Sequence, residues 1–279
     1  MSYREPLSQA IVAISISESP GMAPLGLANE HLTDAMAETA RHLLALGARL
    51  AYGGDLRAGG FTELLFELVA RHRRDADLGD TRPAILSYLP WPAHRAKSAD
   101  ELRSLASELE GLAEVKLLDQ AGQEISFDDL DSRVPTAATP AELADSLTAM
   151  RDAVTRDTDF RIVLGGRVQN FAGRMPGIAE EALSSLNAGQ PLFLLGGFGG
   201  CARDIAEDLG LVPRGVGTAL GWPERQQFAN FTPESLRNEL ELADNELLAR
   251  TVHIDQAIAL VLRGLMRIVG DHQVGAAAP

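Results

Sequence analysis

The chain has 279 residues, of which 46% are hydrophobic, so it can bury the core of one large α/β domain or of one domain with a helical annex. Its formal net charge of −14 repels polyanions at long range and argues against nucleic acid as the main partner. No apolar run approaches the ~20 residues of a membrane span and no export signal is recognised, so with one cysteine we expect a cytoplasmic protein that binds no membrane.

In the first part of the chain, short runs typical of β-strands alternate with amphipathic helical patterns. The runs AIVAISIS, ARLAYGG and PAILSYLP predict three strands, and helices are predicted over residues 29–46 and 62–73 between them. This alternation is typical of βαβ units, whose strands pair in parallel.

The same alternation continues toward the middle of the chain. DELRSLASELEG predicts a helix, AEVKLLD a short strand, and a further helix is predicted with Thr139 as its N-cap and Pro140 at its first position. FRIVLGG and PLFLLGG are continuous apolar runs, which indicate central parallel strands buried on both faces. We therefore predict an α/β fold with a Rossmann-like, doubly wound, mostly parallel sheet.

The last part of the chain predicts a C-terminal helical extension. We expect a Rossmann-like domain over residues 1–213 and an extension over 214–279, which begins with a structured loop and has one helix opening at Thr232 and Pro233. A second helix, over 255–269, is apolar on nearly all sides. Such a helix is either buried in its own domain or covered by a neighbouring subunit, so we also expect a homo-oligomer.

Three of the predicted strands end in pairs of glycines. The pairs are Gly53-Gly54, Gly165-Gly166 and Gly196-Gly197. Parallel strands have their carboxyl ends on one edge of the sheet, where open α/β sheets bind ligands. Glycine also lets backbone N–H groups approach an anion closely, so the pairs predict a phosphate-binding rim, although glycine equally serves ordinary tight turns.

Arginines occur in or just after these loops. They are Arg57, Arg167, Arg174 and Arg203, and the planar guanidinium group suits phosphate or carboxylate. The alternative is that each arginine forms a surface ion pair. That alternative is plausible for Arg203, which has acidic helical neighbours, and weaker for Arg167 and Arg174, which lie in a loop of small and polar residues.

Acidic and hydroxyl side chains accompany these groups. Ser17 and Glu18 follow the first strand and can hydrogen-bond ribose or phosphate, although serine is also an ordinary turn residue. Glu180 and Glu181 lie near the head of a helix. They can cap it, pair with arginines or hold a ribose, and one of them facing the rim can act as a general acid or base.

The segments YGGDLRAGGFTELL, GRMPGIAEEAL and PLFLLGGFGGCARDIAE together resemble the SLOG superfamily, a Rossmann-like group named for the DNA-processing protein DprA and the cytokinin-activating LOG enzymes. The resemblance spans about residues 10–210 and is closest to SLOG domains of bacterial conflict systems and melastatin-type channels. It implies a nucleotide ligand, often NAD-derived or ADP-ribose-like, a role in bacterial defence signalling, and sometimes a partner effector protein. It also implies that Gly165, Gly166, Arg167, Arg174, Gly177 and Glu180 line the pocket, and that Gly53, Gly54, Gly196 and Gly197 face it.

The sequence departs from the compact PGGxGTxxE motif of LOG phosphoribohydrolases. Here Gly165-Gly166 is separated from PGIAEE by an insertion that contains Arg167 and Arg174, and no threonine follows Gly177. The departure favours a ligand-sensing module over an enzyme. The alternative is a LOG-like nucleotide N-glycosidase, or phosphoribohydrolase, with Glu180 or Glu181 as acid or base and Arg174 holding the phosphate.

Other chemistry is not indicated by the sequence. The six histidines lack the spacing of a metal site, and no P-loop or nucleophile elbow is present. Cys201 begins a predicted helix, which can activate a thiol, but a small residue packed beside glycines is the commoner reason for a cysteine there. We therefore expect no metal and no prosthetic group, with an ADP-ribose-like or NAD-like nucleotide as the small-molecule partner.

Overall fold

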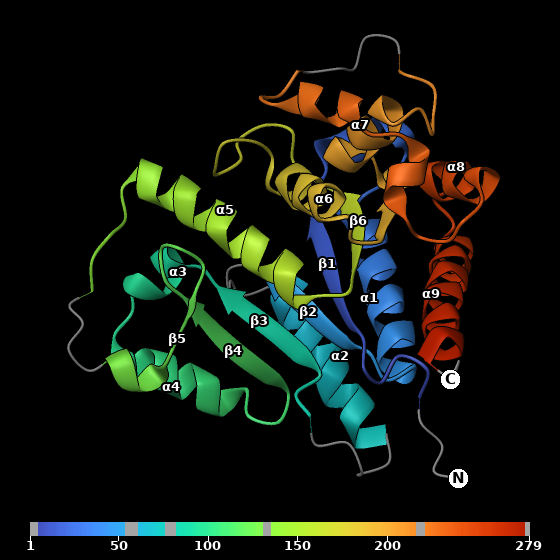
Figure 1. Ribbon diagram of the computed structural model, residues 1–279. Helices are drawn as coiled ribbons and strands as arrows, with labels where there is room; N and C mark the ends of the chain where they lie inside the picture. Colours follow the sequence, from blue (N-terminus) through green and yellow to red (C-terminus); the bar gives the residue numbers. More distant parts are fainter. Residues whose placement is uncertain (1–4, 54–60, 76–81, 131–134, 216–220, 277–279) are drawn as a thin grey trace.

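The computed structural model describes residues 5–53, 61–75, 82–130, 135–215 and 221–276, and shows one sheet with helices on both faces (Figure 1). The strands are β1 (Ile11–Ser17), β2 (Arg49–Gly53), β3 (Ile85–Leu89), β4 (Ala113–Leu118), β5 (Glu124–Ile125), β6 (Phe160–Gly165) and β7 (Leu192–Leu195). The helices are α1 (Asn29–Ala45), α2 (Phe61–Asp75), α3 (Trp91–Arg95), α4 (Ala99–Glu108), α5 (Pro140–Asp157), α6 (Gly177–Ala188), α7 (Gly200–Asp208), α8 (Leu242–Arg250) and α9 (Ile254–Ala276). Short 3-10 turns are η1 (Pro20–Leu25), η2 (Phe127–Leu130), η3 (Gly196–Phe198), η4 (Arg225–Asn230) and η5 (Pro233–Leu236).

The described strands are arranged in the order β5-β4-β3-β2-β1-β6-β7. Every pair is parallel except β4 with β5, which is an edge pair of two residues on each strand. The predicted α/β fold with a Rossmann-like, doubly wound and mostly parallel sheet is therefore confirmed. The sequence analysis did not predict the short elements α3 and β5.

Two hydrophobic layers cover the two faces of the sheet because strand side chains alternate. Val12 and Ile14 belong to the cluster that contains buried residues of α1 and α9, whereas Ala13 between them belongs to the cluster with Ala153 of α5. Figure 1 shows α5 and α6 together on one face, with α1 on the other. Burial on both faces explains why β6 is apolar apart from Arg161.

The strand order reverses between β1 and β6. The chain builds β1 to β4 outward in one direction, then returns through α5 to add β6 on the opposite side of β1. The loops that leave two such strands diverge, which opens a crevice at their carboxyl ends where doubly wound proteins bind ligands. The order of the strands alone therefore predicts a ligand site at the carboxyl ends of β1 and β6.

The C-terminal part packs on the β7 edge and on α1. Leu260, Val261 and Leu265 of α9 lie in the same buried cluster as Leu43 of α1, so the apolar helix buries one side within its own chain. The expected helix at Thr232 and Pro233 is the single 3-10 turn η5, and α8 begins later.

The chain cannot continue as a helix after η5 because Arg237 and Glu239 adopt left-handed φ angles of 48° and 55°. Asn238, between them, is buried and donates from Nδ2 to the carbonyl oxygen of Leu192 on β7 at 2.9 Å. This bond fixes the extension to the edge of the sheet.

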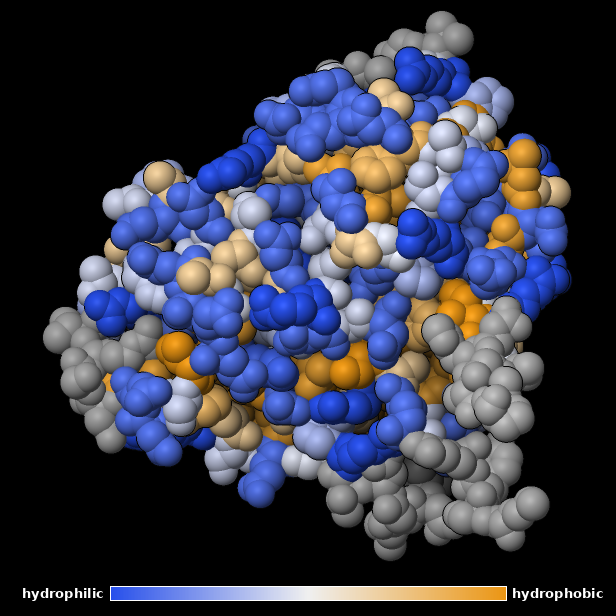
Figure 2. Space-filling model, viewed as in Figure 1, coloured by the Kyte–Doolittle hydropathy of each residue, from blue (hydrophilic) through white to orange (hydrophobic). Residues whose placement is uncertain are grey.

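The described helices and the surface can be compared with what a membrane-spanning protein requires. None of the helices in the described parts of the chain combines the length and apolar character needed to cross a bilayer. On the face seen in Figure 2, hydrophilic residues predominate and hydrophobic residues gather in separate small areas, one of them over α6 and beside α7.

Two glycines after β7 are required by close backbone packing. A Cβ at Gly196 would lie 2.6 Å from the carbonyl oxygen of Ala249, and a Cβ at Gly197 would overlap the carbonyl oxygen of Thr251. We expect Gly197→Ala to destabilise the protein by about 1–3 kcal/mol, because the end of α8 must move away. Chemical denaturation checks this. Gly270→Ala on α9, where a Cβ meets no atom within 4 Å, is the control and should be neutral or slightly stabilising. Equal stability of both variants would show that α8 does not pack as described.

Candidate functional site

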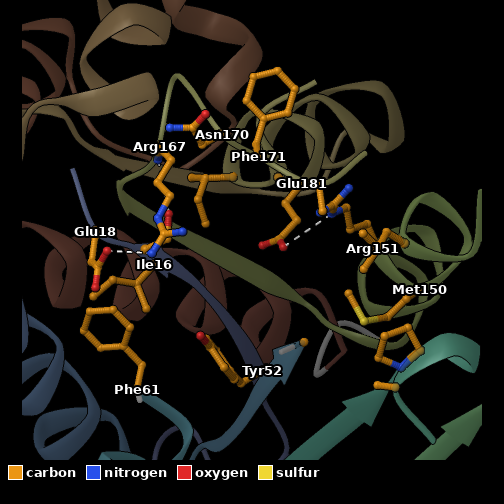
Figure 3. Close-up of a pocket in the computed structure, with 18 of the residues that line it drawn as sticks. Ile16, Glu18, Tyr52, Phe61, Met150, Arg151, Arg167, Asn170, Phe171 and Glu181 are labelled. Carbon is orange, nitrogen blue, oxygen red and sulfur yellow. Dashed lines mark hydrogen bonds and ion pairs between the residues drawn. The ribbon is translucent and has the colours of Figure 1, made fainter. Parts of the chain in front are cut away.

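A cleft of about 860 Å³ lies at the carboxyl ends of β1 and β2, beside the loop that follows β6 (Figure 3). It therefore lies at the reversal of strand order, and the first turns of α1, α2, α3 and α6 border it. The described residues that line it are Ile16, Ser17, Glu18, Asn29, Thr33, Tyr52, Gly53, Phe61, Leu64, Pro90, Pro92, Ala93, Leu143, Leu147, Met150, Arg151, Arg167, Asn170, Phe171, Ala172, Gly177, Ile178 and Glu181.

One end of the cleft carries an ion pair between Arg167 and Glu18. Nη2 of Arg167 donates to Oε2 of Glu18 at 2.6 Å. The loop after β6 begins with Gly165 and Gly166 at φ angles of 67° and 106°, a left-handed geometry that favours glycine. This turn places Arg167 directly beside the end of β1 (Figure 3).

The opposite end of the cleft carries Glu181 of α6 and Arg151 of α5 (Figure 3). Nε of Arg151 lies 3.8 Å from Oε1 of Glu181. This nitrogen has no hydrogen-bond partner, even though the Arg151 side chain is buried, with only 8% of it exposed. The head of α6 beside it has Pro176 as N-cap, without a side-chain cap. The positive end of the α6 dipole lies here, and the Arg151 guanidinium is balanced by the carboxylates of Glu180 and Glu181.

A buried network below the cleft holds Glu181 in place. Arg161 of β6 is 1% exposed and donates to Ser15 Oγ at 2.7 Å and to Glu181 Oε2 at 3.1 Å. It also donates to Ser185 Oγ at 2.6 Å and to Thr155 Oγ1 at 3.0 Å. Burial lowers the pKa of the Arg161 guanidinium, the Glu181 carboxylate opposes that effect, and Arg151 adds to it.

Most of the other lining side chains are apolar or aromatic, with Ser17, Asn29, Thr33 and Asn170 as polar exceptions. Tyr52 lies near the end of β2 and Phe61 begins α2, and Figure 3 shows both across the cleft from Phe171. On α5 the residues Leu143, Leu147 and Met150 share one helix face and line the cleft together with Arg151. The cleft thus has an apolar middle, of the kind that packs against flat rings, and charged side chains at each of its two ends.

The structure brings together part of the site predicted from the sequence. Six of the predicted residues line the cleft: Ser17, Glu18, Gly53, Arg167, Gly177 and Glu181. Five described glycines and charged residues serve close packing or ion pairs outside its lining: Gly165, Gly166, Gly196, Gly197 and Glu180. Arg174 and Arg203 also lie outside the lining. Gly54 and Arg57 are outside the described residues.

The glycines outside the cleft allow elements to approach one another. A Cβ at Gly166 would overlap Sγ of Cys201, and one at Gly165 would lie 2.5 Å from the carbonyl oxygen of Ser17. The glycine pairs at the end of β6 and after β7 therefore allow segments of the chain to pack closely against each other, rather than against a ligand. Gly53 lines the cleft, and a Cβ there would lie 3.0 Å from Cε of Met150.

The charged residues outside the cleft are paired with other groups. Arg174 donates to Asp145 at 2.5 Å, with both side chains more than 60% exposed. Glu180 is buried and accepts from Arg151 and Thr148 of α5, because its position on α6 directs it toward that helix rather than toward the cleft. Arg203 pairs with Glu207 at 3.2 Å, which agrees with the alternative that the sequence left open for it.

Several lining residues were not predicted from the sequence. Tyr52 and Phe61 flank the first glycine loop, so their proximity to the predicted rim was a usable signal. Arg151 gave no such signal, since it lies in the middle of a helix that precedes β6. Only the return of α5 across the sheet toward β1 brings Arg151 to the cleft.

Metal and thiol chemistry receive no support from the described residues. In these parts of the chain no cluster of three or more His, Cys, Asp or Glu side chains is placed to hold a metal ion. Cys201 is fully buried, and burial raises the pKa of its thiol, with Asp204 contributing to the same effect. A buried thiol with a raised pKa is a poor nucleophile, so Cys201 serves packing.

The network around Arg161 generates a stability prediction. We expect Arg161→Leu to lower the free energy of unfolding by about 3–5 kcal/mol, because it leaves the Glu181 carboxylate and three hydroxyls partly unsatisfied in the interior. Chemical denaturation measures this. The control is Arg41→Leu, which removes an exposed pair with Glu38 on α1 and should cost less than about 1 kcal/mol. Similar losses for the two variants would contradict the network's structural role.

The family comparison agrees with this fold. A family model described as SLOG cluster2 matches residues 6–264. SLOG domains form a Rossmann-like class that binds nucleotide ligands, which supports a general ligand-binding role. No curated protein matches the chain. From the match over most of its length, the chain belongs to the SLOG family, in its cluster 2.

Proposed function

We propose that the chain is a ligand-sensing module that binds a nucleotide or a small molecule derived from NAD or ADP-ribose in the cleft between Arg167 and the head of α6. The observation that carries this proposal is the position of the cleft at the reversal of strand order, with an apolar region between two polar ends. Sensing here means that binding alters contacts made by the chain with a partner effector or with other copies of itself. The cellular setting we propose is signalling in bacterial defence.

The dimensions of the cleft suit a ligand larger than a single sugar or phosphate. Its volume of about 860 Å³ lies toward the upper end of the ~300–1,000 Å³ that is usual for small-molecule sites. An ADP-ribose-like molecule has a flat base and a sugar for the apolar region and a pyrophosphate for a polar end. This match in size and chemistry supports the proposed ligand class.

The charges in the cleft favour ligands with few phosphates. Among the described lining residues, the charged ones are Glu18, Glu181, Arg151 and Arg167, whose formal charges cancel. A cleft of this kind, in a chain with a net charge of −14, gives a triphosphate little long-range attraction. We therefore expect AMP or ADP-ribose to bind more tightly than ATP.

A second candidate function is hydrolysis of an N-glycosidic bond, because Glu181 is a carboxylate in the cleft lining. Its Oε2 already accepts from Ser15 and Arg161, which leaves Oε1 for a substrate. This arrangement suits holding a ribose hydroxyl as well as acid or base chemistry. The interrupted glycine motif makes ligand sensing the preferred proposal.

Incubation with AMP, NAD and ADP-ribose separates the two functions. We expect each ligand that binds to raise the melting temperature further as its concentration rises above its Kd, without release of a free base detectable by chromatography. If the unmodified chain releases a free base and Glu181→Gln does not, the chain is an enzyme rather than a sensor. A panel with neither stabilisation nor turnover would contradict both functions.

Arg167 provides a mutational test of the binding site. We expect Arg167→Ala to weaken AMP or ADP-ribose binding by roughly 1.5–3 kcal/mol, because a charge-assisted hydrogen bond to phosphate is lost. Calorimetric titration measures the affinity. Arg174→Ala is the matched control, since Arg174 has a comparable exposed pair outside the cleft lining and should leave binding unchanged. Equal weakening by both variants would place the ligand elsewhere.

A further inference from the structure

An anionic ligand in the cleft would need the guanidinium of Arg167, which is already paired with Glu18. Both residues line the cleft, and the guanidinium extends from the loop after β6 to the carboxylate at the end of β1 (Figure 3). Their side chains are 41% and 56% exposed, so a solute can reach both. The most accessible described cation of the cleft is therefore neutralised by the chain itself.

The backbone segments that carry these two residues are tied to each other. The N–H of Gly166 donates to the carbonyl oxygen of Ser17 at 3.0 Å, and the N–H of Arg167 lies 3.3 Å from Ser17 Oγ, its acceptor. The end of β1 and the loop after β6 are thus held in register. The ion pair can open by rotation of the two side chains, without movement of the strands.

The strength of the pair allows a ligand to displace it. An exposed ion pair of this kind favours its closed arrangement by a factor of at most about five. Phosphate accepts two parallel hydrogen bonds from a guanidinium, which is stronger than one contact with an exposed carboxylate. A phosphate can therefore replace Glu18 as the partner of Arg167. The exchange lowers the affinity for the phosphate, because the ion pair must open and the released Glu18 carboxylate repels the bound anion.

The other end of the cleft does not offer the same exchange. Arg151 is 8% exposed and is held by Glu180 and Glu181, which are themselves mostly buried. Removing a partner from a buried pair leaves an uncompensated charge in the interior, which is costly. The pair that a ligand can displace at low cost is the one between Arg167 and Glu18.

We propose that Glu18 is a specificity-determining residue, which competes with anionic ligand groups for Arg167. This inference rests on the proposed ligand-binding function of the cleft. Glu18 lowers the affinity for phosphate-bearing ligands and leaves the affinity for uncharged nucleosides unchanged. Anions that accept a single hydrogen bond from Arg167 therefore bind poorly, whereas groups that accept two hydrogen bonds from the guanidinium still bind.

The experiment compares Glu18→Gln with Asp145→Asn in the full chain by calorimetric titration. Both substitutions neutralise the acidic partner of an exposed arginine, but Asp145 pairs with Arg174 outside the cleft lining. The probes are AMP, inorganic pyrophosphate and adenosine. We expect Glu18→Gln to tighten AMP and pyrophosphate binding by about two- to tenfold and to leave adenosine unchanged. Asp145→Asn should change none of the three affinities appreciably.

The same comparison in an Arg167→Ala background tests the competition itself. The gain from Glu18→Gln should be clearly smaller there, because no guanidinium is left to release and only the repulsion between Glu18 and the anion is removed. An undiminished gain would mean that Glu18 acts by simple repulsion, which overturns the inference.

The remaining outcomes separate this inference from the proposed function. Weaker AMP binding in Glu18→Gln would show that Glu18 holds the ligand, and would overturn the inference while the proposed function stands. If no nucleotide binds but Glu18→Gln tightens pyrophosphate, the inference stands and the nucleotide-binding function fails. If no probe binds to any variant, both are overturned.

Discussion

The candidate site depends on one buried guanidinium, that of Arg161. From strand β6, which is paired on both sides, it contacts hydroxyls of Ser15 on β1, Thr155 on α5 and Ser185 on α6, as well as the carboxylate of Glu181. A fully buried cation is tolerated only when its donors are satisfied, so these elements have little freedom to shift relative to one another. The head of α6 and Glu181 are therefore held at the edge of the cleft whether or not a ligand is present.

This constraint explains how the cleft combines rigid and adjustable groups. At the α6 end, Arg151 and Glu181 are buried and belong to a connected polar network. At the β1 end, Arg167 and Glu18 are partly exposed and contact mainly each other through their charged groups, on a backbone fixed by Ser17. Under the proposed function, the buried end would keep the shape of the site while the exposed pair at the other end exchanges partners with a ligand.

The sequence predicted the sheet well because its signals are local. A mostly apolar run such as FRIVLGG indicates a strand buried on both faces, and the cap at Thr139 was predicted because Thr139 is followed by Pro140 at the first helical position. The sequence also placed Gly53, Ser17, Glu18 and Arg167 at one edge, because a parallel sheet brings its strand ends together, and all four line the cleft.

The rest of the site depends on contacts between segments far apart in the chain. Gly196 and Gly197 match a ligand-binding pattern, but the backbone of Ala249 and Thr251 packs against them, and that approach is decided by the last helices. Glu180 and Glu181 are adjacent, and only the position of α5 decides that Glu180 meets Arg151 and Thr148 while Glu181 reaches the cleft. The role of Arg151 likewise follows from topology and has no motif.

The most direct test of the account is a crystal structure of the chain with ADP-ribose. The account predicts the ligand between Tyr52 and the head of α6, with a phosphate on Arg167 and with the Glu18 carboxylate turned away from that guanidinium. A ligand bound elsewhere on the molecule, or a cleft filled by the chain's own side chains, would contradict the central claim.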